Sequence, residues 1–229
     1  MPDVNDDDSG ASVVESRHDL LMKFAEGELV GRTVRGVSAA SLAMVAADLD
    51  GTRFERVDLS ASDLSRARLE NATLSQVDFR EGCWSGALWN RVQATTSDFT
   101  QIDLTAATLL RCELADIRMP RALLRGAAVR GCRFTAVELA RADLSSAVVT
   151  RCQFAGYSDG TASLSRVILR GAALVEVDLA RVNLYAADLR GALLVRCDLR
   201  AANLCEADLR GARLVACALD GADLEGAVL

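Results

Sequence analysis

The chain has 229 residues, a formal net charge of −6 and an aromatic content of only 4%. It contains no run of 18 apolar residues, so we expect no membrane-spanning helix and no role at a membrane. The acidic balance argues against direct binding to nucleic acid. The acidic N-terminus lacks the basic and apolar regions of a secretory signal, which predicts a cytoplasmic protein.

The N-terminal segment predicts an acidic tail followed by one short helix. Residues 1–12 are acidic and small, and we expect them to be disordered. Ser16 and Asp19 form a pair that resembles a capping box, and Leu20 and Phe24 supply an apolar face. We expect this helix to cover the open apolar end of the fold that follows. A partner-binding helix is the alternative.

The rest of the chain repeats with a period of five. From Leu49 to Leu229, 25 of the 37 residues spaced five apart are Leu and five are Phe. The residue two before each of these central positions is small, mostly Ala, Val or Cys. Neither the 3.6-residue period of a helix nor the two-residue period of a strand fits this pattern. A five-residue unit cannot bury its own apolar face, so successive turns of the chain must stack.

The units resemble those of the pentapeptide-repeat family. Ala187-Asp188-Leu189 and Ala207-Asp208-Leu209 follow its A(D/N)LXX pattern. The resemblance implies an all-β fold, a right-handed quadrilateral parallel β-helix in which four units make one coil. We divide the chain into residues 1–30, the tail and capping helix, and residues 31–229, a β-helix of about nine to ten coils.

Two stretches depart from the pattern. Trp84 and Trp89 occupy consecutive central positions and Ala94 follows, which indicates either volume compensation in the core or an exposed aromatic recognition spot. In the segment 155–163 the frame would turn Tyr157 and Asp159 inward, at a high cost in free energy, so we expect a loop. The frame resumes unchanged afterwards, so we expect the loop to replace one unit of a four-unit coil.

The cysteines occupy small inward positions. Four-unit coils would stack Cys112, Cys132 and Cys152 in one column and Cys197 and Cys217 in another. We interpret them as small hydrophobic residues rather than as a metal or redox ladder, because the chain has a single histidine to complete a metal site. No metal or cofactor is predicted.

Four-unit coils also sort the outward side chains into charged and apolar columns. One acidic column contains Asp58, Asp78, Asp98, Glu138, Asp178 and Asp198, and the next contains Asp63, Asp103, Asp143 and Asp223 with Asn183 and Asn203. A basic stripe contains Arg91, Arg111, Arg130, Arg151, Arg170, Arg190 and Arg210. An apolar patch contains Val175, Leu193, Val195 and Val215. Each column is a candidate contact surface, or simply a solvated wall whose Asp side chains bond the local backbone.

No catalytic motif is present, so we do not expect an enzyme. The resemblance implies a rod whose acidic columns imitate DNA, bind DNA gyrase or topoisomerase IV, and so confer resistance to antibiotics that poison these enzymes. In this role Asp58, Asp78, Asp98, Asp63, Asp103 and Asp143 would stand in for phosphates. The alternative is a regulatory, secretion-associated or effector-type scaffold that contacts its partner through the apolar patch, the basic stripe and the 155–163 loop. The apolar end at Leu229 also predicts an end-to-end homodimer.

Overall fold

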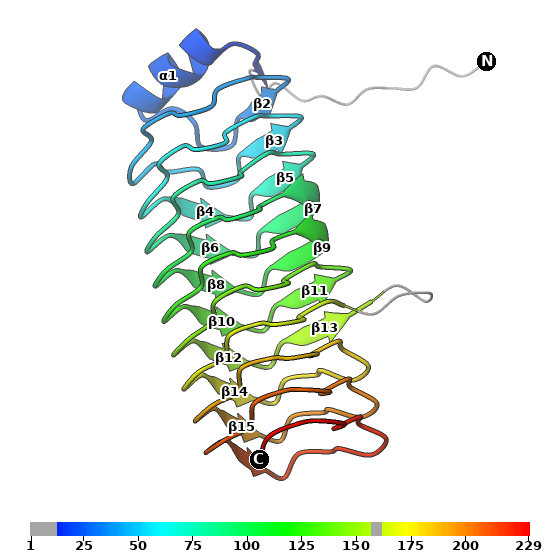
Figure 1. Cartoon of the computed structure of the whole chain (residues 1–229). Helices are drawn as coiled ribbons and strands as arrows, with labels where there is room; N and C mark the ends of the chain where they lie inside the picture. The colour runs from blue at the N-terminus through cyan, green and yellow to red at the C-terminus, as the bar shows by residue number, and fades with distance from the viewer. Residues whose placement is uncertain (1–12, 157–161) are drawn as a thin grey trace, which may run out of the picture.

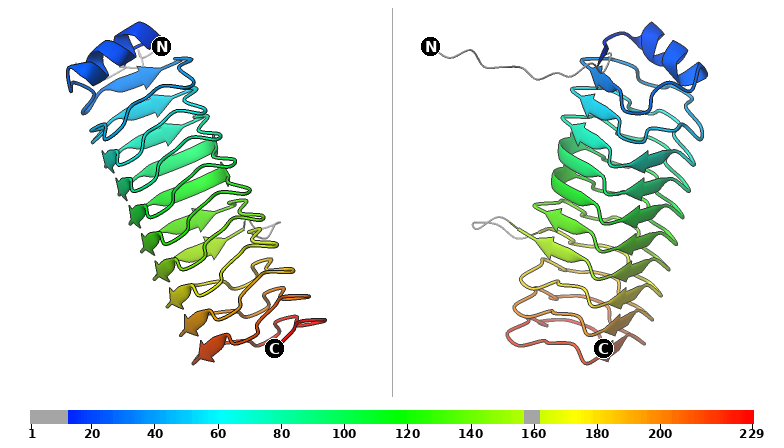
Figure 2. Two further views of the ribbon diagram at one scale, coloured as in Figure 1. Left: turned by 60° about the vertical axis from the view of Figure 1, so that its left-hand side comes forward. Right: turned by 180° about the vertical axis from the view of Figure 1, so that it is seen from behind.

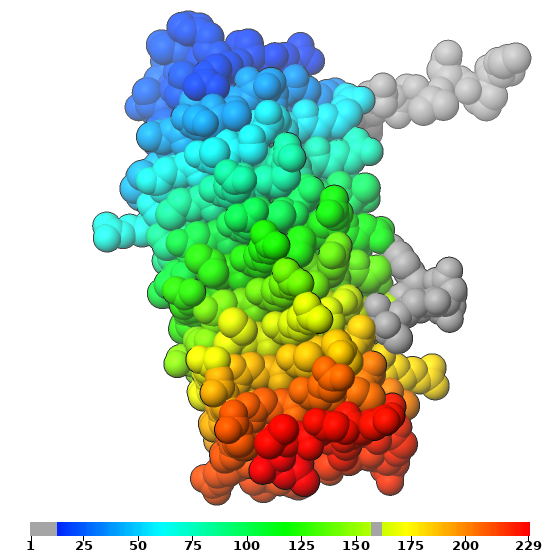
Figure 3. Space-filling view, viewed as in Figure 1, coloured from blue at the N-terminus to red at the C-terminus, as the bar shows by residue number. Residues whose placement is uncertain are grey.

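The computed structural model describes residues 13–156 and 162–229. In this part the chain forms a parallel β-solenoid of about ten coils with one short helix, so the predicted fold is confirmed (Figure 1). The coils stack in chain order into a rod (Figure 3). The predicted disordered tail, Tyr157 and Asp159 lie outside the described residues.

Two parallel sheets of eight strands each form two sides of the rod (Figure 2). The first sheet consists of β1 (Val13–Val14), β2 (Thr33–Arg35), β3 (Arg53–Glu55), β5 (Thr73–Ser75), β7 (Gln93–Asp98), β9 (Glu113–Arg118), β11 (Arg133–Thr135) and β13 (Gln153–Ala155). The second consists of β4 (Arg68–Glu70), β6 (Leu88–Asn90), β8 (Thr108–Leu110), β10 (Ala128–Arg130), β12 (Val148–Thr150), β14 (Ala173–Val175), β15 (Leu193–Val195) and β16 (Arg213–Val215).

The other two sides are joined by single β-bridges between coils. One side, which we call the Asp58 side, has the bridges Asp58↔Asp78 and Asp78↔Asp98. The other, the Asp63 side, has Asp63↔Cys83 and Cys83↔Asp103. Neighbouring coils are therefore about 4.8 Å apart on all four sides, as paired parallel strands require.

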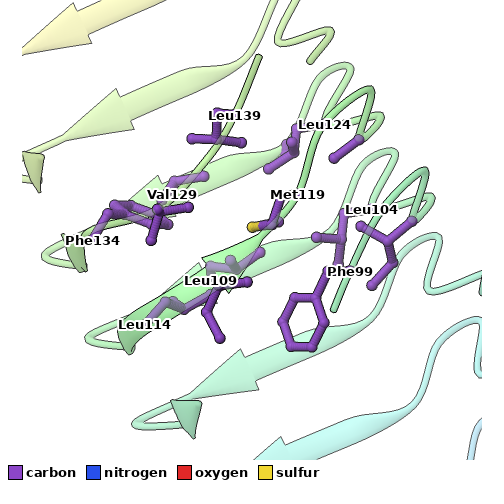
Figure 4. Close-up of a cluster of buried hydrophobic side chains, with 14 of the residues drawn as sticks. Phe99, Leu104, Leu109, Leu114, Met119, Leu124, Val129, Phe134 and Leu139 are labelled. Atoms are coloured by element: carbon purple, nitrogen blue, oxygen red, sulfur yellow. The ribbon is translucent and has the colours of Figure 1, made fainter. Parts of the chain in front are cut away.

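The central residue of each repeat points into one shared interior. Figure 4 shows successive central residues, among them Phe99, Leu109 and Leu139, converging from different sides of the coil. Trp84 and Trp89 have no exposed surface, and their rings pack edge to face 5.3 Å apart. The exposed aromatic recognition spot is therefore wrong. These two large residues fill the core beside the small Ala94, which is also fully buried.

The corners of the regular coils use a left-handed backbone conformation. The residue two after the central one has a φ near +55°, for example +52° at Arg111 and +54° at Arg151. Glycine adopts this conformation without strain, whereas other residues adopt it at a cost of roughly 1 kcal/mol each. The corner N–H groups keep a partner, since Arg111 N–H donates to the carbonyl of Arg130 at 2.8 Å. Hydrogen bonds between coils therefore hold these conformations in place.

Helix α1 (Arg17–Ala25) covers the first coil, as the capping interpretation expects (Figure 1). Its N-cap Ser16 accepts a hydrogen bond from the backbone N–H of Asp19 at 3.0 Å. Leu20 is fully buried and Phe24 packs against the core. No strand was predicted before this helix, yet β1 pairs with β2 and so extends the first sheet by one strand. No helix in the described part of the chain has the length and apolar character that crossing a membrane requires.

One coil is longer than the others by one repeat. Val129 pairs with Val149, four repeats later, but Val149 pairs with Leu174 and Gln153 with Asp178, each five repeats later. The predicted uniform coil, with a loop that replaces a unit, is therefore wrong. The segment instead adds one unit to its coil. Tyr157 and Asp159 fall on the small and central positions of this unit, where burying a phenol and a carboxylate is costly, so its sequence does not match that of a regular unit.

The longer coil moves several residues to a different column from the one predicted. Asp178 and Asp198 continue the column of Gln153 on the first sheet's side and leave that of Asp58. Asn183, Asn203 and Asp223 continue the Asp58 side rather than the Asp63 side. Arg170, Arg190 and Arg210 lie on the Asp63 side, apart from the arginines upstream. The basic stripe is therefore two separate groups.

The cysteine columns change in the same way. Cys112, Cys132, Cys152, Cys197 and Cys217 share one inward column, because backbone hydrogen bonds connect Cys152 to the coil of Val177 and that coil to Cys197. The backbone N–H groups of Cys112 and Cys132 each donate to the sulfur of the next cysteine at 3.4 Å. The hydrogen bond with Cys112, together with burial, raises the pKa of the Cys132 thiol to about 12. Among the described residues no cluster of His, Cys, Asp or Glu could hold a metal ion.

Candidate interaction surfaces

The predicted acidic residues have a local structural role at the turns. Each of the six carboxylates accepts a hydrogen bond from the backbone N–H two residues later, at 2.8–3.0 Å. Asp58, Asp78 and Asp98 occupy consecutive coils and form a continuous row. Asp63, Asp103 and Asp143, in contrast, occupy alternate coils. The row on the Asp58 side is therefore the denser arrangement of carboxylates.

Arginines neutralise part of this acidic surface. Arg80 Nε donates to both carboxylate oxygens of Asp78 at 2.9 Å, and Arg125 Nε donates to Asp143 at 2.5 Å. Burial works to raise the pKa of Asp78, but the hydrogen bonds from Arg80 outweigh it and hold that pKa below its usual range. The backbone N–H of Ser65 likewise lowers the pKa of Asp63. Carboxylates and arginine side chains therefore lie side by side on this surface, so it is not uniformly acidic.

The downstream arginines form a ladder of ion pairs. Arg170 Nε donates to Asp188 at 2.5 Å, and Arg190 donates to both oxygens of Asp188 at 2.8 Å. Arg210 binds Asp208 in the same way. The pKa of Asp188 lies far below its usual range because Arg190 and then Arg170 stabilise the carboxylate. We call this group the Arg–Asp ladder. Its charges nearly cancel.

The upstream arginines are different. In the described part of the chain Arg91, Arg111 and Arg130 have no carboxylate within ion-pair distance. Arg151 is paired with Glu176 at 2.8 Å, and Glu176 also binds Arg196. The uncompensated positive charge of the predicted basic stripe therefore lies on Arg91, Arg111 and Arg130.

The predicted apolar patch is brought together on the second sheet. Val175, Val195 and Val215 pair in register along β14, β15 and β16, and Leu193 lies beside them on β15. The same surface continues upstream through Leu88, which is 36% exposed, Leu110, and Val148, which is 49% exposed. Sequence reasoning found only the C-terminal part of it, because the column was broken at the longer coil. We call the whole surface the apolar face.

The sequence and fold comparisons agree with this architecture. A family model described as pentapeptide repeats matches residues 44–80, 162–200 and 192–229, in eight copies. The chain is a pentapeptide-repeat protein. No curated protein matches its sequence.

Solved structures of the same family resemble the chain over most of its length. A trypsin-treated form of QnrB1, a plasmid-mediated fluoroquinolone resistance protein, is 18% identical; the match covers 92% of this chain and 90% of QnrB1, with a TM-score of 0.56. HetL, a pentapeptide-repeat protein involved in heterocyst differentiation regulation from the cyanobacterium Nostoc sp. strain PCC 7120, is 25% identical. That match covers 93% of this chain and 94% of HetL, with a TM-score of 0.48. At this level the likeness to QnrB1 supports the fold and no more.

Proposed function

We propose that this pentapeptide-repeat protein is a non-enzymatic, cytoplasmic, protein-binding solenoid that docks its partner on the apolar face. The observation that carries the proposal is the composition of that face. From β6 to β15 the second sheet has twelve outward positions, and only Arg130 among them is charged. The corresponding positions of the first sheet are mostly polar or charged, for example Arg53, Gln93 and Glu113.

The apolar face has the properties of a contact surface. It is flat and held rigidly by hydrogen bonds between coils, so a partner would lose little entropy in ordering it. Parallel sheets are usually covered on both faces, whereas the outward side of this one is open in the described structure. Contiguous apolar surface of this kind marks interaction sites on soluble proteins. We infer that a partner with a complementary apolar surface covers it.

The test is affinity capture from the native host followed by cross-linking, using matched charge variants. In Val175→Glu with Val195→Glu, two adjacent residues of the apolar face become acidic. Ser75→Glu with Thr95→Glu places the same charges at equivalent, adjacent positions of the first sheet. The proposal expects one stoichiometric partner to be lost only with the first pair. Equal capture by both variants would exclude the apolar face.

The second candidate is a DNA mimic that binds DNA gyrase or topoisomerase IV and protects it from fluoroquinolones. The continuous row of Asp58, Asp78 and Asp98 supports it, because carboxylates at the coil spacing can engage basic residues that otherwise contact phosphates. Within the row Asp78 is paired with Arg80 and Asp98 with Arg118, so a partner would compete with these two arginines. QnrB1, which has the same fold, is a fluoroquinolone resistance protein. Asp63, Asp103 and Asp143 would contribute a second, interrupted row.

A supercoiling assay with gyrase or topoisomerase IV, with and without a fluoroquinolone, tests this candidate. Asp58→Asn with Asp98→Asn removes charge but keeps an acceptor for the turn N–H groups, so folding should be retained. Protection that this pair abolishes supports the DNA mimic. Absence of both inhibition and protection at micromolar protein refutes it and leaves the scaffold function.

We also propose that two copies associate through the C-terminal coil. Its inward residues are uncovered, with Leu219 37%, Leu224 41% and Leu229 86% exposed, and they line an apolar depression of about 330 Å³. A second copy packed end to end would bury these leucines. Light scattering of the chain against Leu224→Lys would show a dimer that the substitution dissociates. A monomer at all concentrations rules this interface out.

A further inference from the structure

A notch interrupts one corner of the rod at Gly131. At the corner that leads from the second sheet to the first, successive coils place Arg91, Arg111, Gly131 and Arg151 at the same position. Because Gly131 has no side chain, a groove of about 480 Å³ opens between Arg111 and Arg151. Its lining also includes Arg130, Asn90 and Leu110.

The notch continues onto the first sheet. A second depression, of about 260 Å³, shares Arg111, Gly131 and Arg151 with the first and extends to Arg133. Glu113 also lines it, 4.0 Å from Arg133, and both side chains are largely exposed. Four arginines and one glutamate therefore surround Gly131, on a protein whose net charge is −6.

Two of these arginines lack a counterion. Arg111 and Arg130 make no ion pair in the described part of the chain, whereas Arg151 shares Glu176 with Arg196. Elsewhere on the rod most arginines that follow a central residue bind an Asp: Arg190 and Arg210 bind the Asp two residues earlier, and Arg125 and Arg170 bind the Asp 18 residues later. At Arg130 the equivalent positions are Ala128 and Val148. At the notch, therefore, Arg130 has no Asp among the described residues to neutralise it, unlike these other arginines.

We propose that the Gly131 notch binds a phosphate monoester dianion, a property beyond the protein-binding role proposed above. Guanidinium groups present a planar fork of N–H donors that matches phosphate oxygens, and Arg is the residue most often used for this purpose. A phosphate monoester carries a charge of about −1.5 to −2 at neutral pH. The two unpaired arginines balance that charge. The ligand is inorganic phosphate, a small phosphate ester or a phosphorylated side chain.

Calorimetric titration of the full chain with inorganic phosphate at low ionic strength tests the arginines. We expect saturable binding that Arg111→Gln with Arg130→Gln weakens about tenfold or more, because two charge-assisted hydrogen-bond donors are lost. Arg141→Gln with Arg181→Gln is the control, since it removes the same charge from corners elsewhere on the rod that make no ion pair in the described chain. If both double variants lose the same phosphate affinity, the loss comes from the change in net charge and not from the notch, and the proposal is overturned.

A second variant tests the notch itself without changing the charge. Gly131→Gln fills the gap, and Gln76 and Gln101 already hold the same corner conformation, with φ of +55° and +58°. A side chain fits there, because a Cβ on Gly131 would lie 3.8 Å from Cγ of Arg111. Gly171→Gln, at an open corner, is the control. We expect phosphate binding to be lost only in Gly131→Gln, and retention there would overturn the site.

Two further ligands, a phosphoserine peptide and a dinucleotide, show which kind of phosphate compound the notch binds. A phosphoserine peptide that binds more tightly than inorganic phosphate, while its unphosphorylated form does not bind, assigns the notch to a phosphorylated partner. Equal affinity assigns it to free phosphate or a small ester. A dinucleotide with a single phosphodiester should bind much more weakly, since it carries one charge. Binding of the diester as tight as that of the monoester would refute the assignment to a dianion.

Discussion

The upstream and downstream arginines look alike in the sequence but differ in their surroundings. Arg170, Arg190 and Arg210 lie beside Asp188 and Asp208, which bind them from their own coil and from the next. Arg111 and Arg130 lie beside apolar neighbours and bind no acid in the described chain. For an arginine that directly follows a central residue, such as Arg130, Arg170 or Arg190, the residue before the central position of its own or the next coil therefore decides whether an ion pair forms. One column neutralises itself, and the other remains available to a ligand.

Removal of the central acid of the Arg–Asp ladder should have the largest effect. Asp188→Ala leaves Arg170 and Arg190 without their shared partner and frees the turn N–H of Arg190. We expect the free energy of unfolding to fall by about 1–2 kcal/mol. Urea denaturation measures it. Asp58→Ala loses a turn bond but no ion pair, so it should cost less, and an equal cost would show that the ladder adds nothing.

The ladder should also make stability depend on pH. Arg190 and Arg170 lower the folded-state pKa of Asp188, so its contribution is fully present above the unfolded-state pKa near 4 and is lost as the pH falls below it. Lowering the pH from 7 to 3 should therefore weaken the wild type more than Asp188→Asn, as urea denaturation at each pH would measure. Parallel pH profiles of the two proteins would contradict this origin.

The next test introduces an Asp beside Arg130, at the position that Asp188 occupies relative to Arg170. Residue 148 stands to Arg130 as Asp188 stands to Arg170, and Val148 is half exposed. Val148→Asp should pair with Arg130 and reduce phosphate affinity several-fold, while the free energy of unfolding changes by less than about 0.5 kcal/mol. Val148→Asn, which adds no charge, should bind phosphate like the wild type. If the two variants bind equally, the residue before the central position does not control the charge of the arginine.

The smallest effect is expected from deletion of residues 157–161. The deletion joins Gly156 to Ala162 in frame, so the pairing of Gln153 with Asp178 and the ion pair of Arg151 with Glu176 should persist. Shorter loops close at a lower entropic cost, so stability should stay the same or rise by less than about 1 kcal/mol. A disulfide between cysteines introduced at Gln153 and Asp178 reports the register. Failure to form it in the deletion variant would mean that the deleted segment helps to build the wall.

The period of five predicted stacked turns of chain around a shared interior, and the resemblance to pentapeptide-repeat proteins implied the four-unit coil. The buried central residues follow from that period, and the clustering of Val175, Leu193, Val195 and Val215 follows from four-unit coils. The capping helix was predicted separately, from the residues around Ser16 and Phe24. The sequence did not predict strand β1, since two residues before a helix carry no periodic signal. It also missed the left-handed corners, although the glycines that recur two positions after the central residue, such as Gly131, were a usable signal.

The sequence could not predict how the coils after residue 156 are aligned with those before it. The added segment is as long as one repeat, so the frame resumes whether the segment forms a wall or leaves the coil. Only the energetic cost of burying Tyr157 and Asp159 separates the two outcomes. Whether the six Asp residues and the apolar face bind partners stays a prediction, because a repeat determines a shape and not a ligand.

The longer coil has a consequence for how such a rod can change. If Tyr157 and Asp159 were replaced by Ala and Leu, this segment would match the repeat and could enter the coil. Every later side chain would then rotate by a quarter of the circumference, and Arg170 would come into the column of Arg130. Two substitutions could in this way give a new surface pattern to the whole C-terminal part, with the interior left as it is.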